Sequence, residues 1–230
     1  MGNIDQNYLS DLEKYLNSDE DTMEPEEEVV VNNGLKGNIT TDEIRSAEQA
    51  LLYLVVDKSG SMYHYGLEKG VIDGLEEVKR TVNGAKESKC IQTAMTFFGS
   101  TLDMRPFKYG ECIDTTYEAN EGETRMYDAI VESCTNMTSQ YDSLVSECKI
   151  KGVMLIFTDG GENGSKQYNL KDVQNALKEL KKREIVYLVA AFDGIDLSKL
   201  GNDLEAEPIP IKDEHQLRRL MKFVSQRSMA

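Results

Sequence analysis

Two clusters of oxygen-bearing side chains follow buried apolar segments of this chain, and together they could bind a metal ion. Asp57, Ser59 and Ser61 directly follow the apolar run 51–56. Asp159 directly follows a second run of the same kind. Runs of this length that end abruptly in Asp and Gly are typical of buried strands in a parallel sheet. Ligands of open α/β sheets bind at the carboxyl ends of the strands, so we expect these oxygens to converge on one hard cation.

Thr124 adds a further hydroxyl, because it stands at the entrance to an apolar-periodic segment that predicts a helix from about residue 126. Mg²⁺ prefers six oxygens in a near-octahedral array and retains some water, so hydroxyls, water and one or two carboxylates suit it. A shell with few ligand charges leaves the ion electrophilic. We therefore expect an open coordination position to attract a carboxylate from another molecule.

The combined set resembles the metal-ion-dependent adhesion site of von Willebrand factor A (VWA) domains. Its five members are Asp57, Ser59, Ser61, Thr124 and Asp159. The likeness covers roughly residues 47–228 in element order and is closest to the intracellular type of bacteria and phages. It implies that the hydroxyls bind Mg²⁺, with Mn²⁺ or Ca²⁺ as alternatives, and that the aspartates act directly or through water. It also implies that a partner's Glu or Asp completes the shell.

Each residue of the set has an ordinary interpretation when it is taken alone. Asp57 could cap a helix, Thr124 could be an N-cap, and Asp159 with Gly160 could form a turn. The hypothesis of a metal site therefore depends on the whole pattern, in which every residue type occurs in the right order on the right element.

The chain predicts alternating strands and helices. After the first strand, a helix carries Leu67 to Val82, and the connection between the next two strands is so short that they must be antiparallel. Pro106 favours an edge position for the second of these strands. The expected strands are 51–56, 91–98, 102–107, 153–158, 185–191 and 209–211, and later helices are expected at 126–137, 170–180, near 197, and 217–224. The order resembles the VWA fold, an α/β, doubly wound, mostly parallel six-stranded sheet with one antiparallel edge strand and helices on both faces.

Net charge divides the chain into two parts. The full chain has 230 residues and a formal charge of −15, and residues 1–34 hold ten acidic residues and one basic residue. We expect residues 1–46 to form an acidic, flexible arm with a short helix within 8–16, and residues 47–230 to form one VWA-like domain. The arm is interpreted as solvating, with docking to a basic partner or to the metal of a second copy as alternatives. No basic cluster offsets phosphate repulsion, so nucleic acid and anionic membranes are not expected partners.

The cysteines and the apolar segments bear on location. Cys90, Cys112, Cys134 and Cys148 form no C-x-x-C pair, so we expect reduced thiols. The amino terminus has no apolar segment like that of a signal peptide, and no run approaches the roughly 20 residues that span a bilayer. Cytoplasmic residence is the resulting expectation.

Catalysis is not expected. Asp57 at a strand end superficially fits the nucleophile of haloacid-dehalogenase phosphatases, but Ser59 stands where that family places a second Asp. Ser59 and Ser61 lack the G-x-S-x-G elbow of serine hydrolases. The favoured hypothesis is a metal-dependent protein interaction module, an adaptor whose partner is an ATPase or an assembly component. The alternative is a structural or assembly protein with a silent or self-associating site, and an Mg²⁺-dependent phosphohydrolase is the weaker alternative.

Overall fold

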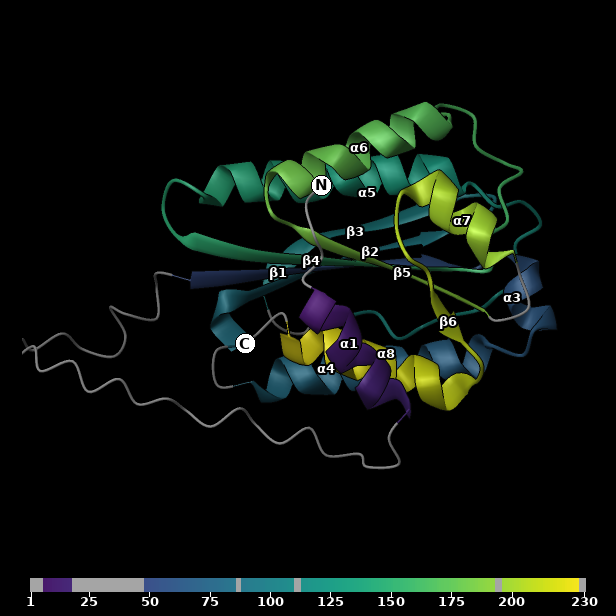
Figure 1. The fold of residues 1–230 in the computed structure, drawn as a ribbon, viewed down its shortest axis with the longest axis horizontal. Helices are drawn as coiled ribbons and strands as arrows, with labels where there is room; N and C mark the ends of the chain where they lie inside the picture. The colour runs from purple at the N-terminus through teal and green to yellow at the C-terminus, as the bar shows by residue number, and fades with distance from the viewer. Residues whose placement is uncertain (1–5, 18–47, 86–87, 110–112, 193–195, 228–230) are drawn as a thin grey trace, which may run out of the picture.

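A six-stranded sheet forms the centre of the protein, with helices on both faces (Figure 1). The structure is a computed structural model that describes residues 6–17, 48–85, 88–109, 113–192 and 196–227. The strand order is β3-β2-β1-β4-β5-β6, and only the β2–β3 pair is antiparallel. The predicted fold class is therefore confirmed. The strands are β1 (Glu48–Asp57), β2 (Ile91–Phe98), β3 (Leu102–Tyr109), β4 (Lys149–Thr158), β5 (Val186–Phe192) and β6 (Ile209–Ile211).

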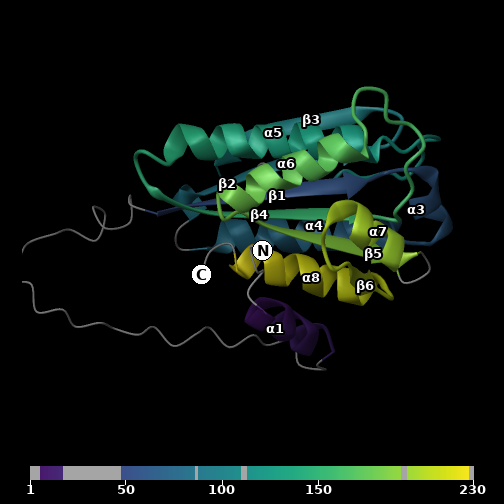
Figure 2. The same cartoon turned by 45° about the horizontal axis from the view of Figure 1, so that its top comes forward.

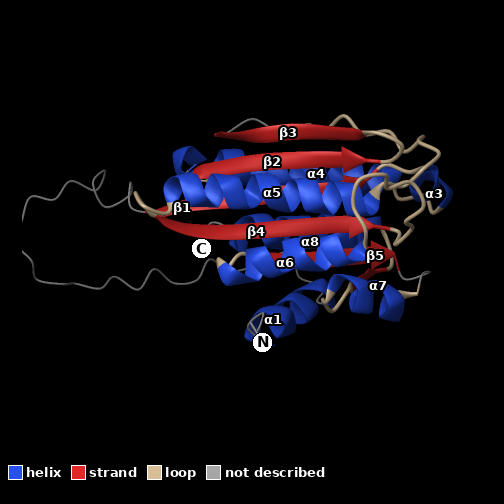
Figure 3. Cartoon of the chain, turned by 90° about the horizontal axis from the view of Figure 1, so that it is seen from above, coloured by secondary structure: helices blue, strands red, loops and turns tan. Residues whose placement is uncertain are grey.

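The helices form two layers (Figures 1 and 2). One face of the sheet is covered by α5 (Met126–Leu144) and α6 (Leu170–Lys182). The other face is covered by α4 (Glu68–Gly84) and α8 (Glu214–Arg227), with α1 (Gln6–Asn17) against α8. The short helix α3 (Gly60–His64) and α7 (Leu197–Leu204) lie toward the carboxyl ends of the parallel strands, where loops gather in Figure 3. A 3₁₀ turn, η1 (Ser88–Cys90), precedes β2.

The sequence of β1 is continuously apolar because this strand lies in the interior of the sheet. Leu52, Leu54 and Val56 join the core beneath α4 and α8, while Tyr53 and Val55 join the core beneath α5 and α6. Both faces of the strand are buried, so alternation of polar and apolar residues is absent.

The site-forming ends of β1 and β4 lie side by side in the middle of the sheet. Val56 pairs with Phe157 in the parallel register, so the residues that follow each strand emerge next to each other. The chain leaves β1 toward β2 on one side and later returns to β4 on the other. This is a topological switch point, where ligands of open α/β sheets bind.

Most predicted elements coincide with the observed ones. β2 and β6 have the expected bounds, and β3 is an antiparallel edge strand. The helix α6 begins at a reciprocal capping box formed by Asn169 and Asp172. The helix α5 extends beyond the predicted residue 137 to Leu144, since partly buried side chains near its end still pack against the core.

The helix α1 confirms the short helix predicted within residues 8–16, and it is packed onto the domain. Leu12, Tyr15 and Leu16 are buried. The Tyr15 ring lies 5.8 Å from the ring of Phe223 and beneath the guanidinium of Arg219, 4.4 Å from it. Residues 18–47 lie outside the described part of the chain, so the flexible arm and the division at residue 46 remain predictions.

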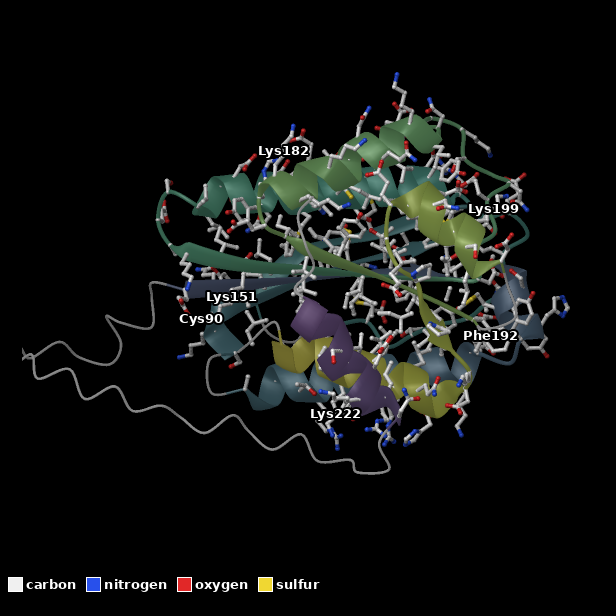
Figure 4. All side chains as sticks on the ribbon, viewed as in Figure 1. Cys90, Lys151, Lys182, Phe192, Lys199 and Lys222 are labelled. Carbon is white, nitrogen blue, oxygen red and sulfur yellow. The ribbon has the colours of Figure 1, made fainter. Side chains whose placement is uncertain are left out.

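The cysteines and the membrane prediction can be compared with the structure. Cys90, Cys134 and Cys148 are free thiols, and Cys112 lies outside the described residues. Cys90 lies at the amino ends of the strands, at the opposite end of the molecule from Phe192, which ends β5 (Figure 4). Within the described ranges, none of the helices combines the length and the apolar character that crossing a bilayer requires.

The packing of α1 predicts that it contributes to the stability of the domain. Replacing the buried Leu12 by Ala should lower the free energy of unfolding by about 2–4 kcal/mol, because it leaves a cavity between α1 and α8. Urea denaturation followed by circular dichroism measures the change. Glu13→Ala, at an exposed neighbouring position, should change it by less than about 0.5 kcal/mol. Equal small effects of both variants would show that α1 is not part of the cooperative unit.

Candidate metal centre

Asp57 ends β1 and is completely buried, with 0% of its surface exposed. Its Oδ1 accepts a hydrogen bond from the backbone N–H of Ser59 at 2.8 Å. Its Oδ2 accepts one from the hydroxyl of Thr158, also at 2.8 Å. Thr158 ends the neighbouring strand β4, so the carboxylate is fixed from two strands at once.

The hydroxyls of Ser59 and Ser61 lie 3.0 Å apart, close to the Asp57 carboxylate. Ser59 immediately precedes α3, but its side chain makes no capping hydrogen bond. Neighbouring ligands of an octahedral Mg²⁺ ion, each about 2.1 Å from the metal, are about 3.0 Å apart. The observed separation therefore fits two adjacent ligands of one Mg²⁺-sized ion, and it equally allows a hydrogen bond between the two hydroxyls.

Thr124 and Asp159 face the same small space beside Gly161. A Cβ atom placed on Gly161 would lie 3.2 Å from Oδ1 of Asp159 and 3.8 Å from the hydroxyl oxygen of Thr124. Arg125, not Thr124, is the residue that precedes the first turn of α5, so the N-cap interpretation of Thr124 is wrong. Instead, the backbone N–H of Thr124 donates to the side chain of Asn163 at 2.8 Å, and its hydroxyl makes no hydrogen bond with another described residue.

The electrostatics of the site favour a cation. Burial raises the pKa of Asp57 to about 6, and the negative charge of Asp159 raises it further, against the lowering effect of hydrogen bonds from Ser59 and Thr158. Two carboxylates thus share a water-poor space without a basic side chain bonded to either in the described part of the chain. A bound divalent ion would relieve this unfavourable charge.

The donor set consists of hard oxygens. The structure places all five predicted residues at the carboxyl ends of β1 and β4 and at the start of α5. Among the described residues, no group of three or more His, Cys, Asp or Glu side chains forms an alternative metal cluster. Mg²⁺ and Mn²⁺ prefer hard oxygen ligands such as these hydroxyls and two carboxylates, whereas zinc prefers softer ligands. The direct ligand role of each residue stays a prediction.

Several residues that hold the site were not predicted from the sequence. The hydroxyl of Tyr117 donates to the backbone carbonyl of Asp57 at 2.6 Å. Glu121 forms an ion pair with Lys58 at 2.7 Å, and its carbonyl accepts from the N–H of Gly60 at 2.7 Å. These contacts fasten the segment 117–121 to residues 57–61, which we call the metal-binding loop after their predicted role. The only sequence signal was a tyrosine and charged residues in a segment without periodicity.

The loop 160–168 is fixed by two acidic residues. The buried carboxylate of Asp128 accepts backbone N–H groups from three consecutive loop residues, each at 3.0 Å, and pairs with Arg125. Burial raises the pKa of Asp128, but these donors outweigh it and hold the pKa below its usual value. Glu162 accepts from the N–H groups of Ser165 and Tyr127, which joins the loop to α5. Gly160 has φ +82°, a conformation that favours glycine directly after Asp159.

Comparison with known proteins supports the fold but gives no sequence family. No protein-family model and no curated protein sequence matches the chain. Among solved structures, a von Willebrand factor type A protein from Catenulispora acidiphila matches 80% of this chain and 43% of its own, with TM-score 0.60 and 13% identity. Manganese-loaded TRAP protein from Plasmodium vivax matches 76% of this chain and 73% of its own, with TM-score 0.56 and 20% identity.

A third similar structure contains an occupied site. Proximal thread matrix protein 1 of the mussel byssus, with a zinc-occupied metal-ion-dependent adhesion site, matches 78% of this chain and 48% of its own, with TM-score 0.58 and 16% identity. The chain spans less than half the length of this protein and of the Catenulispora protein. At these identities the likeness shows the fold, which is that of VWA domains.

The raised pKa of Asp57 predicts a specific dependence of stability on pH. In chelator, the unfolded chain loses the Asp57 proton near pH 3.8 and the folded chain loses it near pH 6, so burial of this group costs stability as the pH rises between these values. The free energy of unfolding relative to Asp57→Asn should therefore fall by about 3 kcal/mol between about pH 4 and pH 6 and then stay constant. Urea denaturation at each pH measures it.

Saturating Mg²⁺ or Mn²⁺ should restore most of this loss above pH 6 in the native chain and not in Asp57→Asn. Parallel pH profiles of the two proteins in chelator would contradict the assigned electrostatics of the site.

Proposed function

We propose that the VWA fold of this chain is a metal-dependent protein interaction module. In this proposal Asp57, Ser59, Ser61, Thr124 and Asp159 hold a Mg²⁺ ion, and an Asp or Glu of a partner protein completes its shell. The observation that carries the proposal is the convergence of two carboxylates and the serine hydroxyls on one buried space at the switch point of the sheet. A bound divalent ion would offer an electrophilic position to an incoming carboxylate.

The hydrogen bonds of Asp57 indicate how the five residues would divide the metal-binding roles among them. Both of its oxygens already accept hydrogen bonds, from Ser59 and Thr158. Asp57 is therefore suited to act on the metal through water, while the hydroxyls of Ser59, Ser61 and Thr124 supply neutral ligands. Neutral ligands leave more of the positive charge of the ion available to a partner.

The surface around the site has the character of a protein interface. Tyr63 and Tyr65, in and just after α3, expose 62% and 42% of their surface. Tyr65 also stacks on Phe192, with ring centroids 4.9 Å apart, which limits its motion. Exposed tyrosines held in place are enriched at protein interfaces because they bury a large area at small entropic cost. The proposal includes a protein partner that is an ATPase or an assembly component. It also includes a cytoplasmic adaptor role, in which the chain binds its partner without catalysing a reaction.

Water proton relaxation with Mn²⁺ tests the proposal directly. Protein loaded with one equivalent of Mn²⁺ should show enhanced relaxation, because water occupies the open position of a slowly tumbling complex. Adding N-acetyl-glutamate amide at millimolar concentration should lower the enhancement as the carboxylate displaces this water. The matched probe N-acetyl-glutamine amide, which lacks the charge, should leave it unchanged.

Two other results would contradict the proposal. Equal responses to both probes would exclude carboxylate capture. An enhancement that is the same for native protein and for Asp57→Asn would place Mn²⁺ elsewhere, and would favour the alternative of a structural protein whose site is silent.

A further inference from the structure

A cavity of about 390 Å³ opens directly beside the metal-binding loop. Gly60, between the two serines, lies on one wall together with Tyr63 and His64 of α3. Glu68, the first residue of α4, and Glu118 lie on the other walls. The cavity therefore adjoins the loop that carries Ser59 and Ser61.

The wall that carries Glu118 is fixed relative to the metal-binding loop. Its neighbour Tyr117 is buried and donates to the carbonyl of Asp57, and Ser59 forms a parallel bridge with Glu121. The N–H of Ala119 donates to Oε1 of Glu68 at 2.9 Å, which joins this wall to α4. Hydrogen bonds thus join this wall of the cavity to the metal-binding loop and to α4.

The cavity is negatively charged. Glu68 and Glu118 contribute two carboxylates, and no Lys or Arg is among its described lining residues. No ion pair with another described residue neutralises either carboxylate, whereas the nearby Lys58 is already paired with Glu121. The exposed ring of Tyr63 adds an aromatic face, which attracts cations.

These features indicate which charged groups a partner segment must carry. A carboxylate alone would be attracted by the metal and repelled by Glu118 and Glu68. A segment that carries a basic side chain close to its metal-binding carboxylate would satisfy both charges. Building on the function proposed above, we propose that the cavity between α3 and residues 118–120 binds the Lys or Arg side chain of the same partner segment whose Asp or Glu reaches the metal. At about 3.3 Å of chain per residue, a cavity that adjoins the loop places this basic residue within about three positions of the acidic one.

Selection from a random heptapeptide display library tests this inference. Peptides are bound to immobilised Mn²⁺-loaded protein and eluted with chelator. With the native chain, the eluted pool should be enriched in Asp or Glu with Lys or Arg within three positions. With Glu118→Gln, the acidic residue should persist and the basic residue should return to its frequency in the library. Glu147→Gln, which removes an exposed charge just before β4 at the opposite end of the sheet, should give the native result.

A selected peptide then shows how much its basic residue contributes to the binding affinity. Replacing its basic residue by Gln should weaken binding to the native chain about 5- to 10-fold in isothermal titration, and should change binding to Glu118→Gln less than 2-fold. Acidic peptides without a basic preference, or an equal preference with Glu118→Gln, would overturn the basic subsite and leave the proposed function intact. A pool that lacks acidic residues, or that matches the pool from Asp57→Asn, would overturn the proposed function and this inference with it.

Discussion

The burial of the Asp57 carboxylate at the end of β1, next to Asp159 at the end of the neighbouring parallel strand, is the constraint on which the site depends. Asp57 is completely buried beside the charge of Asp159, and its pKa rises to about 6 as a result. A fold gains nothing from such a pair unless a cation compensates it, since burial of an unpaired charge is costly. The proposed cation would compensate this charge, and the surrounding hydroxyls would supply its neutral ligands.

The loops around these carboxylates are held by the protein itself. Tyr117 and Glu121 hold the metal-binding loop, while Asn163 and Asp128 hold the loop 160–168 to Thr124 and to α5. Most of these contacts join segments that are distant in the sequence, so the site is formed by the fold rather than by any single motif. Because the loops are already ordered, binding of the metal and the partner would incur only a small free-energy cost for ordering them.

The elements could be predicted from the sequence because they have local signals, and the five candidate site residues lie at the ends of these elements. The apolar run before Asp57 identifies β1, and the short connection before Leu102 requires an antiparallel edge strand. The supporting contacts have no such signal. Tyr117 reaches the carbonyl of Asp57 across 60 residues from a segment without regular structure, so only the folded chain reveals it. The docking of α1 on α8 and the acidic cavity beside α3 likewise arise from tertiary packing.

Isothermal titration of Mg²⁺ and Mn²⁺ into chelator-stripped protein tests the central claim most directly, with Thr124→Ala and Thr124→Ser as a matched pair. The backbone of Thr124 provides the hydrogen bonds to the loop 160–168, so removal of its hydroxyl should leave the fold intact. The account predicts one binding site in the native chain, an affinity lowered about 10- to 100-fold in Thr124→Ala, and near-native affinity in Thr124→Ser. Absence of binding by the native chain, or equal affinity of native chain and Thr124→Ala, would contradict the account.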